Sequence, residues 1–247
     1  MTSEWEYRPA PDLEKGVAER LAEFPREPTM LSYALRSAAA LALRAWLGVY
    51  HRLRIHGREN LPSEGSFILI GNHASHLDAL TLNAAIPLAK LHRAFPAAAA
   101  DYFFSSLPRS AFSAIFINAI PFERKGGGAS SLTVCEKLLE RPGNILVIFP
   151  EGTRSTTGEL GRFRSGIGRL AAGKPIPVVP AFLHGGARAW PKGAAIPRPR
   201  PLSLRIGTPR EYGDLPQNRE SVAQVCNELQ EAVAELGRRS EEEERSV

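Results

Sequence analysis

The chain has 247 residues, 43% of them hydrophobic and 23% charged, a composition that fits one sizeable globular domain with its own core. The net charge of +5 favours a polyanionic partner, such as nucleic acid, a phosphorylated metabolite or an acidic membrane surface, without choosing among them. Only Cys135 and Cys226 are present, which excludes a disulfide-stapled scaffold and indicates two reduced thiols in an intracellular protein.

The N-terminal segment, residues 1–28, is charged, polar and rich in proline. Such a composition predicts a poorly ordered or loosely docked segment. It lacks the basic stretch and apolar core of a signal peptide, so no secretion signal is expected.

Residues 29–57 predict an amphipathic helix. At 100° per residue, the apolar face carries Leu31, Leu35, Ala38, Ala42, Trp46 and Val49. The opposite face carries Arg36, Ser37, Arg44 and His51. Two interpretations remain open: the helix packs on its own domain, or it lies in a membrane interface with its arginines near lipid phosphates. A membrane-spanning helix is not predicted, because Arg44 interrupts the longest uncharged run.

Residues 58–236 alternate between strand and helix patterns and predict one α/β domain with a largely parallel central sheet flanked by helices. Apolar runs indicate strands near residues 66–72, 115–123, 144–150, 176–185 and 201–207. Amphipathic runs indicate helices near residues 77–86, 131–141 and 219–237. The charged end, residues 237–247, predicts a solvated tail.

The stretch "GNHASHLDAL", residues 71–80, places two histidines and an aspartate where a buried strand ends. Ser75 and Asp78 fit a capping box that opens a helix. His73, His76 and Asp78 are also conceivable metal ligands, although their spacing matches no recognised ligand set. The third interpretation is a dyad, in which Asp78 orients His73 and His73 removes a proton from a hydroxyl.

A second polar stretch, "EGTRSTTG" at residues 151–158, also follows a buried strand. A glycine turn at the carboxyl end of a strand is a common place for an anion, and Arg154 offers a planar fork that matches phosphate oxygens. The sequence contains neither a G-x-S-x-G nucleophile elbow nor a Walker-type loop. These patterns favour attack by a bound substrate hydroxyl over attack by a protein nucleophile.

Together the two stretches resemble the blocks of the glycerolipid acyltransferases, in particular the PlsC-like 1-acylglycerol-3-phosphate (lysophosphatidate) acyltransferases. "NHASHLD" is similar to the N-H-x-x-x-x-D block of that family, and "FPEGTRS" to its third block. "INAIPFERKG" and "IPVVPAF" are looser matches to the second and fourth blocks. The resemblance covers about residues 55–210.

The resemblance implies transfer of an acyl group from a thioester, on CoA or acyl carrier protein, to a lysophospholipid hydroxyl. The favoured acceptor is 1-acylglycerol 3-phosphate, which gives phosphatidic acid. His73 would be the general base, Asp78 its orienting partner, and Arg124 and Arg154 the phosphate ligands. Glu151, Gly152 and Thr153 complete the implied substrate-binding set, with Glu151 meeting a substrate hydroxyl or an arginine.

The same resemblance implies no metal or redox cofactor and no nucleic-acid partner. It implies a peripheral enzyme on the inner face of the cell membrane, in contact with an anionic lipid surface. The tetrahedral intermediate would need hydrogen-bond donors, which we expect from backbone amides of residues 151–154 or near Asn72. Three alternatives stay open: another acceptor such as glycerol 3-phosphate or a different lysolipid, a thioesterase-like hydrolase, and a membrane-binding protein without turnover.

Overall fold

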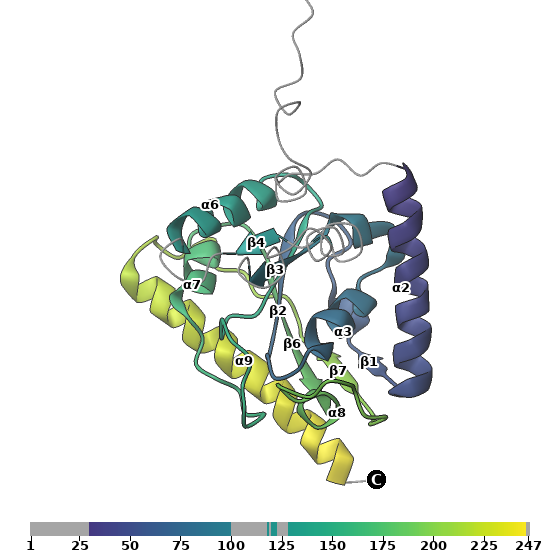
Figure 1. Ribbon diagram of the computed structural model, residues 1–247. Coiled ribbons are helices and arrows are strands. Elements are labelled where there is room, and N and C mark those ends of the chain that lie inside the picture. Colours follow the sequence, from purple (N-terminus) through teal and green to yellow (C-terminus); the bar gives the residue numbers. More distant parts are fainter. Residues whose placement is uncertain (1–29, 100–117, 119, 123–127, 246–247) are drawn as a thin grey trace, which may run out of the picture.

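The computed structural model describes residues 30–99, 118, 120–122 and 128–245, drawn in colour in Figure 1. Their strands form one seven-stranded sheet in the order β1-β7-β6-β2-β5-β3-β4. The strands are β1 (Arg54–His56), β2 (Phe67–Gly71), β3 (Ala94–Ala99), β4 (Ile120–Phe122), β5 (Ile145–Ile148), β6 (Val178–His184) and β7 (Ser203–Ile206). Neighbouring strands are parallel except β6 and β7. The predicted α/β domain with a largely parallel sheet is confirmed.

Helices cover both faces of the sheet (Figure 1). The α-helices are α2 (Met30–Tyr50), α3 (Leu77–Ala85), α6 (Gly128–Leu139), α7 (Ser165–Ala171), α8 (Gly186–Ala189) and α9 (Arg219–Arg245). Two short 3-10 helices, η1 (Arg58–Asn60) and η2 (Leu88–Arg93), complete the described elements.

The central strands are buried on both sides, which explains their unbroken apolar runs. Along β2, Phe67 and Leu69 join the core beneath α2 and α3. Ile68 and Ile70 point the other way and join the core beneath α6, α7 and α9. The period-two alternation of a strand therefore divides one apolar run between two cores.

This topology creates a crevice at the carboxyl ends of β2 and β5. The two strands are paired in parallel, with Ile70 opposite Ile148. The chain leaves β2 toward α3 on one face and leaves β5 toward α7 on the other. In open α/β sheets, such a divergence marks the place where ligands bind. Both polar stretches singled out in the sequence begin here.

The orientation of α2 is the reverse of the one that packing through its predicted apolar face would give. Leu31, Leu35 and Val49, expected on the apolar face, are 69%, 43% and 83% exposed. Arg36 and His51, expected on the polar face, are buried. Every exposed side chain described in α2 is uncharged. The helix thus packs on the domain through a side that carries Arg36 and Arg44 together with the fully buried Leu47, and it leaves most of its predicted apolar face outside.

Hydrogen bonds from arginine side chains to the end of α3 explain why this side of α2 faces the domain. The last carbonyl groups of a helix lack partners within it. Arg44 of α2 donates a hydrogen bond to the carbonyl of Ile86, immediately after α3. Arg58 donates to the carbonyl of Ala84 at 3.0 Å. These cations satisfy the C-terminal end of α3 and interact favourably with its dipole. Trp46, predicted on the apolar face, is half-buried, and its ring lies edge-on to that of His51 with centroids 4.9 Å apart.

A solvated tail is predicted for residues 237–247. The structure instead continues α9 as a helix to Arg245. Arg238 forms ion pairs with Glu231 and Glu235, and Arg239 with Glu235, so the charges stabilise neighbouring helical turns. Gly237 also lies against the ring of Phe182, where an added Cβ would come within 3.0 Å. Among the helices in the described ranges, none is long and apolar enough to cross a bilayer.

Candidate active site

His73 and Asp78 form a hydrogen-bonded pair at the carboxyl end of β2. His73 Nδ1 lies 2.9 Å from Asp78 Oδ2, and Asp78 is 1% exposed. The imidazole stacks on the ring of Phe149, with ring centroids 4.2 Å apart and planes 14° from parallel. The His73 side chain is 19% exposed, so it reaches the surface of the site while its aspartate partner is enclosed. Contacts on its edge and its face fix the orientation of the ring.

Asp78 also caps the start of α3. Its Oδ2 accepts hydrogen bonds from the backbone N–H groups of Ala74 at 2.7 Å and Ser75 at 2.8 Å. The helix begins at Leu77, one residue later than the capping-box pattern suggests, because Ser75 Oγ accepts from the Leu77 N–H. One carboxylate oxygen therefore receives both the cap donors and the histidine. The capping and dyad interpretations describe the same side chain.

Glu151 braces the two halves of the site. Its Oε1 accepts a hydrogen bond of 2.6 Å from the His73 N–H, and its Oε2 accepts one of 2.9 Å from the Gly161 N–H. The side chain is buried, and burial raises its pKa while the two backbone donors oppose that shift. Both oxygens are thus occupied by the protein itself. This arrangement differs from the predicted contact with a substrate hydroxyl or an arginine, since Arg164 Nε donates to the Glu151 carbonyl instead.

Other residues of the turn at 151–158 also connect the loop after β5 with the loop after β2. Gly152 adopts a φ of 72°, and an added Cβ would lie 2.6 Å from Arg164 Nε, so the turn requires glycine. The Ser155 N–H donates to the His73 carbonyl at 2.7 Å, which ties the third block to the first. Thr153 is exposed at the tip of the turn.

Arg154 lies beside His76, a residue to which the sequence assigned no definite role. Arg154 Nη1 donates to His76 Nε2, and the His76 ring lies 5.0 Å from Trp190. Burial lowers the pKa of His76, and the positive charge of the neighbouring Arg154 lowers it further. A neutral imidazole that accepts from a guanidinium is not available to a cation. The metal interpretation of His73, His76 and Asp78 therefore does not fit this arrangement.

Comparison with known proteins agrees with this geometry. The acyltransferase family model matches residues 52–184, which contain the dyad and the glycine turn. The chain belongs to the acyltransferase family. It is 29% identical over 202 residues to a 1-acyl-sn-glycerol-3-phosphate acyltransferase of Bacillus subtilis, covering 80% of this chain and 94% of that one. The predicted family resemblance is confirmed.

Two further relatives give the same result. A chloroplastic 1-acyl-sn-glycerol-3-phosphate acyltransferase of Arabidopsis thaliana is 29% identical over 189 residues, or 75% of this chain and 49% of the plant protein. This acyltransferase thus spans about half the length of its plant relative. The crystal structure of PlsC from Thermotoga maritima, a 1-acyl-sn-glycerophosphate acyltransferase, shares the fold. It aligns with a TM-score of 0.64 and 21% identity over 89% of this chain and 87% of that one.

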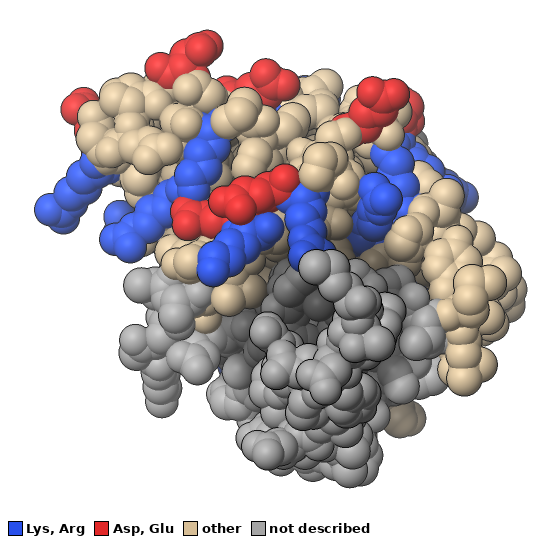
Figure 2. Space-filling model, turned by 90° about the horizontal axis from the view of Figure 1, so that it is seen from above, with Lys and Arg blue, Asp and Glu red and all other residues tan. Residues whose placement is uncertain are grey.

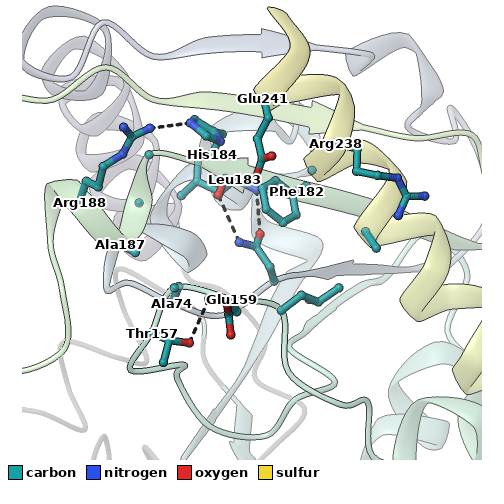
Figure 3. Close-up of a pocket in the computed structure, with 17 residues that line it drawn as sticks. Ala74, Thr157, Glu159, Phe182, Leu183, His184, Ala187, Arg188, Arg238 and Glu241 are labelled. Carbon is teal, nitrogen blue, oxygen red and sulfur yellow. Dashed lines mark hydrogen bonds between the residues drawn. The ribbon is translucent and has the colours of Figure 1, made fainter. Parts of the chain in front are cut away.

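A cavity of about 690 Å³ is lined by Asn72 and Ala74, the two sequence neighbours of His73, and by residues of α9 (Figure 3). Asn72 forms part of its wall and exchanges two hydrogen bonds with the backbone of Leu183. Arginine and glutamate side chains both line it: Arg188, Arg238, Glu159 and Glu241. This mixed charge does not single out a polyanionic ligand. At the cavity wall, an added Cβ on Gly186 would lie 3.1 Å from Asp78 Oδ1.

Sequence reasoning missed the supporting residues because their signals are long-range. Ser75 Oγ donates to the Trp190 carbonyl at 2.8 Å across 115 positions. Nothing in the local pattern around Trp190 indicates that it lies against His76. Arg124, the other predicted phosphate ligand, lies outside the described residues.

Proposed function

We propose that the protein transfers a fatty acyl group from a thioester, on CoA or acyl carrier protein, to the free hydroxyl of 1-acylglycerol 3-phosphate. The observation that carries this proposal is the oriented His73–Asp78 pair in a chain of this family. The same activity appears in the names of its relatives.

In the proposed mechanism, His73 is the general base. With Nδ1 engaged by Asp78, Nε2 accepts the proton of the acceptor hydroxyl as its oxygen bonds to the thioester carbonyl carbon. The tetrahedral intermediate then collapses, the C–S bond breaks, and the thiolate takes the proton from the imidazolium. Asp78 stabilises that transient positive charge, and Phe149 holds the ring in place. No covalent acyl-enzyme is required.

Donors for the tetrahedral oxyanion are more restricted than the sequence suggested. The amides of His73, Ala74 and Ser75 already donate to the carboxylates of Glu151 and Asp78. The amides of Gly152 and Ser155 donate to carbonyl groups. The amides of Thr153 and Arg154 remain as our candidates.

Phosphate binding is assigned to Arg154, together with Arg124. Arg154 is half-buried on the turn that contacts the backbone of His73, which supports a position close to the base. Holding the acceptor phosphate there brings its hydroxyl to Nε2, which supplies orientation more than chemistry. Glu151 is a positioning residue in this proposal, and Gly152 shapes the turn.

Membrane contact is assigned to the exposed side of α2. Leu31, Leu35 and Val49 lie there without a charged neighbour on the same face. Figure 2 looks down on the end of the molecule where α2 begins, and its right-hand edge over α2 is uncharged. An uncharged exposed face of this length fits the lipid interface. We propose that the enzyme is peripheral, on the inner face of the cell membrane.

One assay tests the reaction. Purified protein is incubated with labelled acyl-CoA or acyl carrier protein and a panel of lysolipids and glycerol 3-phosphate, and the products are separated chromatographically. We expect phosphatidic acid, and a loss of about 10²–10⁴-fold in kcat for His73→Ala. Free fatty acid released equally with and without acceptor would instead identify a hydrolase. Wild-type turnover in His73→Ala would refute the dyad.

A further inference from the structure

The segment of residues 191–200, "PKGAAIPRPR", has an unusual surface composition. Ile196 is 76% exposed, and Lys192, Arg198 and Arg200 are exposed around it. No acidic residue occurs anywhere between positions 185 and 210. A single exposed isoleucine needs no explanation by itself. An exposed isoleucine amid uncompensated cations, however, complements an anionic lipid surface.

This segment is attached to the end of α2. The Tyr50 hydroxyl donates to the Pro197 carbonyl at 3.1 Å. His51 Nδ1 lies 3.1 Å from the Arg200 carbonyl, and the His51 carbonyl accepts from the Leu202 N–H. Figure 1 shows the chain after α8 reaching the lower end of α2. Ile196 therefore lies next to a helix end where Val49 is 83% exposed.

The same segment is also attached to the active site. Ser75 pairs with Pro191 in an isolated β-bridge. Trp190 accepts a hydrogen bond from Ser75 Oγ, and its ring packs on His76, the neighbour of Arg154. Trp190 Nε1 also donates to the Ala194 carbonyl at 2.9 Å, which closes the turn. One short, proline-rich segment thus connects the exposed helix with the phosphate-binding arginine.

We propose that residues 191–200, together with Val49 and Tyr50, form a membrane-contact surface, here called the loop surface. Ile196 and Val49 enter the lipid interface, and the cations of Lys192, Arg198 and Arg200 meet anionic headgroups. The inference rests on the proposed function only in taking the acceptor to be held in a membrane. Because Trp190, the residue before the segment, packs on His76, the depth of the segment in the headgroup layer sets the height of Arg154 relative to lipid phosphates.

Neutralising the cations gives the first test. Each basic residue near an anionic surface is worth ~1 kcal/mol, or about a fivefold change in affinity. Lys192→Gln with Arg198→Gln should therefore weaken binding to phosphatidylglycerol vesicles about 25-fold at low salt, and less at high salt. The matched control is Lys137→Gln with Arg169→Gln, two exposed positions on α6 and α7. Equal effects of the two pairs would overturn the proposal.

A label at Ile196 gives a readout that is independent of catalysis. Cys135 and Cys226 are buried, so a polarity-sensitive fluorophore should react selectively with Ile196→Cys. We expect its emission to shift to the blue with phosphatidylglycerol vesicles, and no shift for the same label on Arg169→Cys. If the emission of the label at position 196 does not shift although the protein still binds vesicles through α2, the proposal of the loop surface is overturned. A shifted label on protein without acyl transfer would sustain it and refute the proposed function.

Discussion

Replacing Glu151 by glutamine tests whether this residue binds substrate or holds the site together. A glutamate offers two oxygens to the N–H groups of His73 and Gly161, whereas a glutamine offers one. One of the two buried N–H groups must then face the NH2 group of the glutamine, so that both of these donors are left unpaired. Each unpaired group costs about 1–3 kcal/mol. Relief of the buried charge offsets part of this cost, so we expect a net loss of ~2–4 kcal/mol. For a chain of this size, that lowers the melting temperature by about 5–15 °C.

The assay combines thermal unfolding with kinetics on the folded fraction. Glu151→Gln should melt early and lose kcat, because the His73 backbone is released, while KM for the lysolipid changes little. Glu140→Gln, an exposed site just after α6 and outside the cavity lining, is the control for the chemical change itself. An unchanged melting temperature together with a large rise in acceptor KM would refute the brace and restore the predicted substrate contact.

Four further outcomes follow from the structure. Asp78→Asn should lower kcat by about 10–150-fold, since a hydrogen bond to a charged imidazolium is worth ~1.5–3 kcal/mol. The rate of acyl transfer at saturating substrate measures this loss, and an unchanged kcat would contradict the prediction. His76→Leu should raise the KM for the lysolipid acceptor several-fold, and His76→Gln should raise it much less, because glutamine can still accept a hydrogen bond from Arg154 and leucine cannot. Equal KM values for the two variants would contradict this prediction. The pKa of His76 lies below its ordinary value of 6.5, so the unfolded chain takes up this proton first on acidification. Stability should then fall below pH 6.5 in wild type and less in His76→Gln, as measured by denaturant unfolding. Cys135, whose pKa burial raises to about 12, should resist alkylation at pH 8 until the protein unfolds, as mass spectrometry would show.

The sheet and the dyad could be predicted from the sequence because their signals are local. Apolar runs as short as those of β2 and β5 can be buried on both faces only in a parallel sheet between helix layers. The polar residues that follow each run then meet at one edge, whatever the details of the loops. His73 and Asp78 lie five positions apart, so their pairing needs only one turn of chain.

The orientation of α2 could not be predicted in the same way. Periodicity identifies two faces, but it cannot say that α3 presents free carbonyl groups for Arg44 and Arg58. The protein contacts of Glu151 could not be predicted for a related reason, since its partners are backbone amides, which leave no trace in the residue pattern. The last turns of α9 depend on ion pairs within the helix and on contacts with a strand distant in the sequence.

The helix α3 has only nine residues, and its two ends make different contacts. The first turn carries Asp78, and the last carbonyl groups receive arginines from α2 and η1. At 1.5 Å per residue, only about 14 Å of rigid helix separates them. α3 therefore acts as a strut between α2, for which we propose lipid contact, and the carboxylate of Asp78, which hydrogen-bonds to His73. In the proposed peripheral arrangement, a tilt of α2 would be passed along this strut, so we expect turnover to respond to lipid composition and curvature as well as to acceptor concentration.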